Sequence, residues 1–208
     1  MNKHLTPLID AYIKYFGQAY NSNVWEVGSR DGNDAVEISL RISRPLAVRS
    51  ITALEPNPEQ AYAIRRDHPE INVIEEAASD VNGTDDFMVY KGDIGAVGSS
   101  SLNLEWKKGD LKGEIIRVGI IRLDELVKDG EIIDVMKIDV EGYSLQALKG
   151  LGRKIHQVRV FHIETETWTD SYEAVKSFMF ERGFELVAET EEYSGMPDLV
   201  YINKAMVL

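Results

Sequence analysis

Two acidic side chains, Asp139 and Glu141, directly follow an apolar run that ends at Ile138. Residues two apart in an extended segment point the same way, so we expect both carboxylates to face one site. One carboxylate can take the proton of an attacking hydroxyl while the other orients that hydroxyl, which makes both candidate catalytic residues. In the structural alternative, Asp139 only caps the following helix. Glu141 would then pair with Lys137 or Arg159.

A third acid, Glu164, ends a later apolar strand in which it alternates with His162. Because Glu164 lies nearer the carboxyl end, we expect it in the substrate pocket and His162 inside the strand. Paired carboxylates can also hold a divalent ion that makes a hydroxyl easier to deprotonate. The sequence pattern identifies no third ligand, so no metal site is predicted.

A glycine-containing turn separates an apolar segment that ends at Gly28 from a helix-compatible segment that starts at Asp34. Strand, tight turn and helix in this order hold nucleotide-like ligands in many α/β folds. Glycine permits positive φ angles and lets a ligand lie against the backbone. The free N–H groups at the start of the helix then face that ligand.

The charges of this turn select among nucleotide-like ligands. It has neither the glycine spacing of a dinucleotide site nor the lysine of a P-loop. Glu26 and Asp31 would repel a polyphosphate and suit a sulfonium, so S-adenosylmethionine is favoured over NAD or ATP. A less favoured alternative is that Glu26 is a partly buried strand acid held by local donors. Likewise, Asp31 and Asn33 could only cap the helix, and Arg30 could point to solvent rather than to a cofactor carboxylate. The predicted cofactor-binding residues here are Glu26, Gly28, Ser29, Arg30, Asp31, Gly32 and Asn33.

The second predicted strand, 50–54, is followed by three predicted cofactor-binding residues, Glu55, Pro56 and Asn57. An acid about 20 residues past the glycine turn is where such folds hold ribose hydroxyls. A carboxylate suits this role because it accepts from two neighbouring hydroxyl groups at once. Ala78 and Ser79 follow the third predicted strand, where adenine lies in this kind of fold, although a plain strand-end turn explains them too.

Hydrophobic periodicity places these residues in an α/β fold. Strands that alternate with helices indicate one mostly parallel sheet covered on both faces, with an antiparallel closing pair. A single domain spans 1–208: residues 1–21 hold a helix that either packs on the sheet or forms a lid, and 24–208 form the core. Predicted helices are 5–20, 34–42, 59–67, 123–127, 144–151 and 170–182, and predicted strands are 24–28, 50–54, 71–77, 132–138, 157–163, 184–188 and 199–202, with a small β insertion at 86–90 and 114–121.

Composition narrows the class of protein further. The 208 residues are 44% hydrophobic and 28% charged, which is typical of a globular domain. A net charge of −12 argues against nucleic acid as a partner. Without cysteine, the chain has no thiolate chemistry. We see neither a signal peptide nor a membrane span, so we expect a cytoplasmic protein without a membrane partner. The oligomeric state is left open.

Several segments resemble FkbM-type methyltransferases in kind and order. Lys137-Ile-Asp-Val-Glu-Gly142 is the most specific of them, and the similarity runs from about Val24 to about Glu164. Two departures are Tyr143-Ser144, which replaces a small residue and an acid, and Glu166, which stands where many members have histidine. The other matching segments are 26–33, 54–58, 76–80, 99–102, 123–126 and 148–150.

The resemblance implies a class I, Rossmann-like, three-layer fold with a seven-stranded sheet. It also implies that the enzyme uses S-adenosylmethionine. Such enzymes commonly methylate hydroxyls of sugars, glycans or small natural products, and we expect the same here. Two alternatives are a non-catalytic binding domain with this fold and an NAD-dependent oxidoreductase.

Residues 92–110 form a loop that is long for a compact domain, which signals a binding loop or disorder. The predicted substrate-binding residues are Ser100, Ser101, Tyr143 and Glu164.

Overall fold

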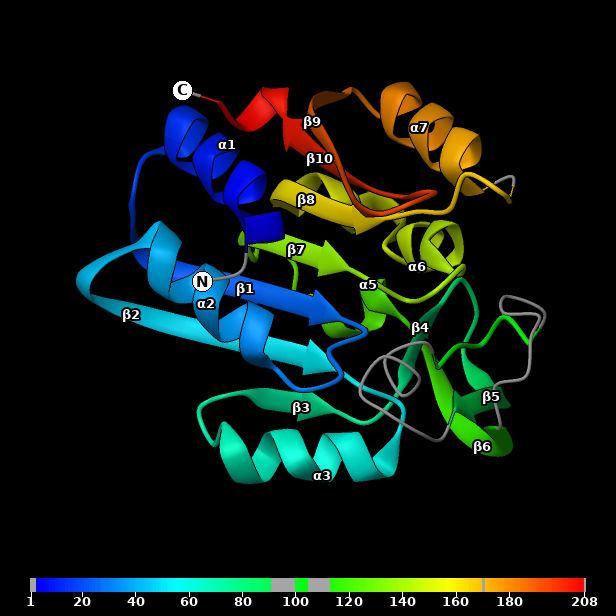
Figure 1. Cartoon of the computed structure of the whole chain (residues 1–208). Helices are drawn as coiled ribbons and strands as arrows, with labels where there is room; N and C mark the ends of the chain where they lie inside the picture. The colour runs from blue at the N-terminus through cyan, green and yellow to red at the C-terminus, as the bar shows by residue number, and fades with distance from the viewer. Residues whose placement is uncertain (1–2, 91–99, 105–112, 170, 208) are drawn as a thin grey trace.

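The computed structural model describes residues 3–90, 100–104, 113–169 and 171–207. Its main sheet has seven strands in the order β3-β2-β1-β7-β8-β10-β9 (Figure 1). All neighbours from β3 to β8 run parallel, and β10 runs antiparallel to both β8 and β9. The strands are β1 (Ala19–Val27), β2 (Ser43–Leu54), β3 (Asn72–Ile74), β7 (Ile133–Ile138), β8 (Val158–Glu164), β9 (Phe184–Tyr193) and β10 (Met196–Asn203).

Helices cover both faces of this sheet. Neighbouring residues of the central strand β7 belong to different cores: Val135 packs with Leu8 and Ile38, and Met136 packs with Leu148. This alternation follows from the side-chain period of a strand and explains why β7 is buried along its whole length. The helices are α1 (Thr6–Phe16), α2 (Asn33–Ile42), α3 (Pro58–Asp67), α5 (Leu123–Leu126), α6 (Ser144–Gly150) and α7 (Ser171–Glu181), with 3₁₀ turns η1 (Lys3–Leu5), η2 (Gly152–Gln157) and η3 (Lys204–Met206).

The predicted β insertion forms a second sheet at the carboxyl edge of the first (Figure 1). It consists of β4 (Ala77–Ser79), β5 (Gly83–Tyr90) and β6 (Gly113–Arg122), in the order β4-β6-β5. The prediction of one strand over 71–77 was wrong, because this segment is split between the two sheets. β3 pairs with β2 in the main sheet, and β4 pairs with β6 in the small one.

Several other element boundaries differ from the prediction: α1 ends earlier, at Phe16, and β9 extends to Tyr193. β2 begins at Ser43 rather than near residue 50, and β1 begins at Ala19. The first half of β2 is largely exposed and pairs with the start of β1, so it lacks the hydrophobic pattern by which a buried strand is recognised.

Helix α1 belongs to the core. Leu8 and Tyr12 are buried against the sheet, and the Tyr12 hydroxyl donates a hydrogen bond of 2.7 Å to Asp134 on β7. The structure therefore favours the packed-helix interpretation over a lid. Within the described ranges, no helix is long and apolar enough to cross a membrane.

Candidate active site

A cavity opens beyond the carboxyl ends of β1, β2 and β7, and some of the predicted site residues line it. Its empty volume is about 580 Å³, part of it open to solvent. It joins the glycine turn, the segment after β2, the start of the small sheet and the segment after β7. The lining residues are Gly28, Arg30, Leu54, Glu55, Pro56, Asn57, Gln60, Glu76, Ala77, Ala78, Phe87, Ser100, Leu102, Asp139, Val140, Glu141 and Tyr143.

The glycine turn has the backbone geometry that the sequence predicted. Gly28 has φ 81°, and a Cβ at this position would lie 1.9 Å from the backbone oxygen of Asp139. Its N–H donates to the Leu54 carbonyl at 3.0 Å. Gly32 has φ 77° and is the N-cap of α2, and Arg30 is also left-handed with φ 55°. The turn thus needs glycine where it crosses the end of β7.

Glu55 lies on the cavity wall with its carboxylate fixed by the backbone. The N–H of Arg30 donates to Oε2 and the N–H of Asn57 donates to Oε1, each at 2.8 Å. Burial raises the pKa of Glu55 to about 7, and these two hydrogen bonds and the charge of Arg30 offset part of that rise. Each carboxylate oxygen has a second lone pair, so both can still accept from hydroxyl groups.

Three carboxylates meet at the other end of the cavity. One oxygen of each of Asp139, Glu141 and Glu164 lies within 4.8 Å of the others. Burial raises the pKa of Glu164 to about 11, and the charges of Asp139, Glu141 and Asp198 add to this effect. Glu164 arrives from β8, whose Ile163 pairs with Ile138 of β7.

Asp139 and Glu141 do both line the cavity, but the prediction that an extended segment points them there was wrong. Glu141 is left-handed with φ 50°, so the segment is not extended and strand alternation does not place the two carboxylates. Ser101 donates its hydroxyl hydrogen to the carbonyl of Glu141 and supports this conformation. Glu164 also supplies the third carboxylate whose absence led to the prediction of no metal site.

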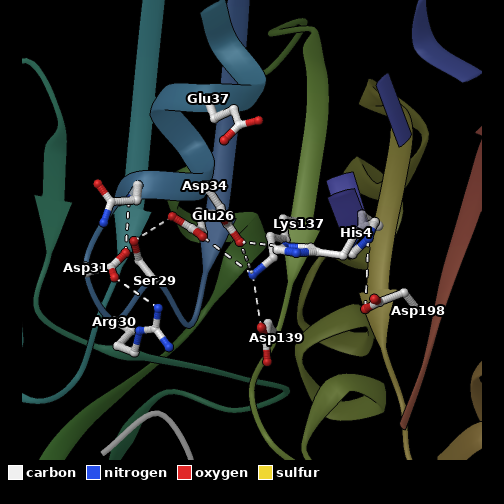
Figure 2. A network of polar contacts seen from close by, with 12 residues as sticks. His4, Glu26, Ser29, Arg30, Asp31, Asp34, Glu37, Lys137, Asp139 and Asp198 are labelled. Atoms are coloured by element: carbon white, nitrogen blue, oxygen red, sulfur yellow. Dashed lines mark hydrogen bonds and ion pairs between the residues drawn. The ribbon is translucent and has the colours of Figure 1, made fainter. Parts of the chain in front are cut away.

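Lys137 occupies the space between these acids and the glycine turn. Its Nζ lies 2.9 Å from Asp139, 3.3 Å from Asp34 and 3.6 Å from Glu26 (Figure 2). Both structural alternatives for the paired acids were wrong. Lys137 pairs with Asp139 rather than with Glu141, and Arg159 pairs with Asp134. The N-cap of α6 is Tyr143, so Asp139 does not cap that helix.

Glu26 does not line the cavity. It is 1% exposed, its Oε2 accepts the Ser29 hydroxyl at 2.7 Å, and its Oε1 faces Lys137. Burial raises its pKa to about 7, with the charge of Lys137 opposing that rise. Local donors hold this carboxylate, which was the less favoured interpretation of the sequence.

Other predicted residues also lie outside the lining. Asp31 accepts from the N–H of Asn33 at 3.0 Å and pairs with Arg30 at 3.0 Å. The N-cap of α2 is Gly32, without a side-chain cap hydrogen bond, so neither Asp31 nor Asn33 is the cap. Ser79 is fully buried beneath α6, where a Cβ at Gly150 would lie 2.1 Å from the Ser79 carbonyl oxygen. The full set outside the lining is Glu26, Ser29, Asp31, Gly32, Asn33, Ser79, Ser101 and Glu164.

The cavity also contains residues that were not predicted. Phe87 and Leu102 provide apolar surface, and Gln60 and Glu76 provide polar groups beside Ala78. The only sequence signal was the β insertion, which contains Phe87. Part of the predicted loop 92–110 lies outside the described residues, which include Ser100 on the lining and Ser101 beneath it.

The topology and the crevice at the carboxyl ends of β1 and β2 define a class I, Rossmann-like methyltransferase fold. Residues 26–186 match the model of the methyltransferase FkbM domain. The chain belongs to the FkbM methyltransferase family, as predicted, and both the predicted fold class and S-adenosylmethionine as the cofactor of that family are confirmed.

Two similar solved structures share this fold. Methyltransferase FkbM from Methylobacillus flagellatus KT has a TM-score of 0.60 and 11% identity, over 92% of this chain and 47% of that chain. Fibrillarin from Aeropyrum pernix, solved with natively bound S-adenosylmethionine, has a TM-score of 0.51 and 14% identity, over 94% and 74% of the two chains.

A curated relative is the hexuronic acid methyltransferase AglP of Haloferax volcanii. It is 26% identical over 157 residues, which are 74% of this chain and 59% of that protein. The chain therefore spans less than two thirds of the length of this relative and about half the length of the M. flagellatus protein.

Proposed function

We propose that this chain transfers a methyl group from S-adenosylmethionine to a hydroxyl of a sugar, a glycan or a small natural product. The observation that supports this most directly is the joint location of two features in one cavity. Glu55 lies on one wall, where its carboxylate can accept hydrogen bonds from ribose hydroxyls of the donor. Asp139 and Glu141 lie on another wall as carboxylates able to take a proton. The relative named as a hexuronic acid methyltransferase supports a sugar acceptor.

The charge of the cavity fits the donor. Its described lining contains the acids Glu55, Glu76, Asp139 and Glu141, with Arg30 as the lining cation. Such a wall attracts a sulfonium and repels a polyphosphate, so it supports S-adenosylmethionine over NAD. Glu55 would accept from ribose hydroxyls, Arg30 would meet the carboxylate of the donor, and Phe87 with Ala78 would flank the adenine.

When bound in this cavity, S-adenosylmethionine would supply a methyl group carried on positively charged sulfur. Asp139 or Glu141 accepts the hydroxyl proton as the acceptor oxygen attacks. Residues of the cavity wall would hold the acceptor oxygen close to the methyl group, and orientation of this kind can supply roughly 7–11 kcal/mol of the barrier.

Calorimetric titration with S-adenosylhomocysteine tests the donor site. We expect the wild-type protein to bind and Glu55→Ala to bind at least roughly tenfold more weakly, since a tenfold change corresponds to about 1.4 kcal/mol. Glu59→Ala is the matched control, because Glu59 is an exposed acid in the first turn of α3. Absence of binding by the wild type, or equal binding by Glu55→Ala, would overturn the proposal.

Incubation with labelled S-adenosylmethionine and a panel of neutral sugars, uronic acids and glycans tests the acceptor. We expect label on a hydroxyl oxygen, and much slower labelling by Asp139→Asn. A protein that binds the donor but labels no acceptor in the panel or in a host extract would support the non-catalytic alternative instead.

A further inference from the structure

Lys137 is a buried cation shared by three segments of the site. Its side chain is 7% exposed on the central strand β7. Asp139 comes from the segment after the same strand, Glu26 from β1 and Asp34 from the start of α2, and Figure 2 shows the three carboxylates around its Nζ.

The ammonium group of Lys137 stays charged in this position. Burial alone would lower the pKa of Lys137, but the charges of Asp139, Glu26 and Asp34 outweigh burial and raise it well above its usual value. A permanent positive charge beside three carboxylates, of which Glu26 is buried and the other two are partly exposed, fixes where those carboxylates lie, because moving one away separates opposite charges at a largely buried position.

Lys137 reaches the cavity only through Asp139, which lies where the glycine turn crosses the end of β7. Asp139 lines the cavity, its N–H donates to the Val27 carbonyl at 2.9 Å, and its carbonyl oxygen packs against Gly28. Lys137 does not line the cavity. Any effect of Lys137 on a bound molecule therefore passes through its partners, and the shortest contact is with Asp139.

We propose that Lys137 is a positioning residue for methyl transfer: its ammonium group holds the Asp139 carboxylate in the orientation that receives the acceptor hydroxyl. This inference rests on the proposed function. It assigns Lys137 more than the role of a structural ion pair, and a purely structural pair on the same strand serves for comparison. Near the other end of β7, the buried Asp134 pairs with Arg159 of β8 at 2.7 Å, and neither residue lines the cavity.

The test compares Lys137→Met, Lys137→Arg and the matched variant Arg159→Met. We expect Lys137→Met to lower kcat roughly 100-fold, the size of effect that a misplacement of about 1 Å produces. The dissociation constant of S-adenosylhomocysteine should change much less, and Lys137→Arg should restore most of kcat because it retains the charge. Arg159→Met should lower thermal stability and leave kcat nearly unchanged.

A double-mutant cycle isolates the route through Asp139. In an Asp139→Asn background, Lys137→Met should have little further effect on kcat, because the group that it positions is already altered. If Lys137→Met does not fold, the cycle uses Lys137→Arg, whose smaller loss should likewise disappear in that background. Additive losses, an unchanged kcat in Lys137→Met, or an equal loss in Arg159→Met would overturn the inference.

Crystal structures of the wild type and of a Lys137 variant give a readout that does not depend on activity. We expect the Asp139 carboxylate to turn away from its wild-type position in the variant, and an unmoved carboxylate would contradict the inference. A wild-type protein that fails to bind S-adenosylhomocysteine would instead refute the proposed function, so the two failures are distinguishable.

Discussion

At the scale of single residues, the acid cluster needs positive charge or protons close by. Lys137 neutralises Asp139 at 2.9 Å. Glu164 has a buried Oε1 without a hydrogen-bond partner in the part of the chain that the structure describes. With its pKa raised to about 11 by burial and by Asp139, Glu141 and Asp198, Glu164 carries a proton at neutral pH.

Glu164→Gln should therefore be tolerated, since the amide keeps the shape and neutrality of the protonated acid. Between the ordinary pKa of glutamate and about 11, the folded wild type holds a proton that the unfolded chain releases. Its stability falls as pH rises through this range, by about 1.4 kcal/mol per pH unit for one proton. We expect Glu164→Gln to gain relative to the wild type from pH 6 to pH 8 in urea unfolding with EDTA.

Glu173→Gln is the control for this comparison, because Glu173 is an exposed acid on α7. Its difference from the wild type should not vary with pH. A difference between Glu164→Gln and the wild type that is equally independent of pH would contradict a buried proton on Glu164.

Glu55 should make donor binding depend on pH. Burial raises its pKa to about 7 in the free protein, and ribose hydroxyls donate to its ionised form. Below pH 7 the carboxylate must first lose a proton, so affinity for S-adenosylhomocysteine should rise with pH, by roughly tenfold per unit at most. Calorimetry in two buffers of different ionisation enthalpy should detect proton release at pH 6, and Glu55→Gln should show neither effect.

At the scale of elements, the sheet is built around the crossing of the glycine turn over the end of β7. Gly28→Ala should destabilise the protein by at least about 3 kcal/mol, because φ is 81° and the new Cβ would lie 1.9 Å from the Asp139 carbonyl oxygen. Gly130 has φ 74° with no atom within 4 Å of its ideal Cβ. Gly130→Ala should therefore lose only about 1–2 kcal/mol, the strain of the left-handed backbone.

Chemical denaturation of both variants measures the two contributions separately. Equal losses of unfolding free energy would show that only backbone strain acts at Gly28. The end of β7 would then shift to accommodate the new Cβ at no measurable cost in stability. Loss of S-adenosylhomocysteine binding in Gly28→Ala but not in Gly130→Ala would further connect this crossing to the donor site.

Sequence patterns predicted elements whose hydrophobic period reflects burial. β7 and the antiparallel closing pair are such elements. The glycine turn was predicted from the spacing of its glycines instead. The exposed half of β2 was not predictable, because it is held by backbone pairing with β1 and not by buried side chains. The split between β3 and β4 depends on a partner, β6, that lies some 40 residues further along the chain.

The candidate site was predictable in its segments but only partly in its side chains. Glu55, Asp139 and Glu141 line the cavity as predicted, since the carboxyl ends of parallel strands meet at one edge. Glu26 and Ser79 do not, because side-chain direction at a strand end depends on the neighbouring strand or helix. Phe87 reaches the cavity from the second sheet, and this arrangement is a tertiary property.

At the scale of the whole molecule, charge is the property that bears on the acceptor. The chain has 35 acidic residues against 23 lysines and arginines, and acids line the candidate active site. A separate surface cavity is basic, with Lys149, Arg153, His156 and Arg182 on its lining beside Glu181. This basic cavity is formed by η2 and the ends of α6 and α7, and Lys149 in the last turn of α6 also complements the dipole of that helix.

Nucleic acid should accordingly not bind at physiological salt. Non-specific binders reach dissociation constants of about 10⁻⁴–10⁻⁶ M through lysine and arginine contacts to phosphates. With a net charge of −12, we expect fluorescence anisotropy of labelled RNA to show no saturable binding in this range. Any weak binding at low salt should disappear in Lys149→Glu/Arg153→Glu, which would assign it to the basic cavity. Saturable binding that survives physiological salt and is competed by S-adenosylhomocysteine would place RNA at the active site and contradict a sugar or small-molecule acceptor.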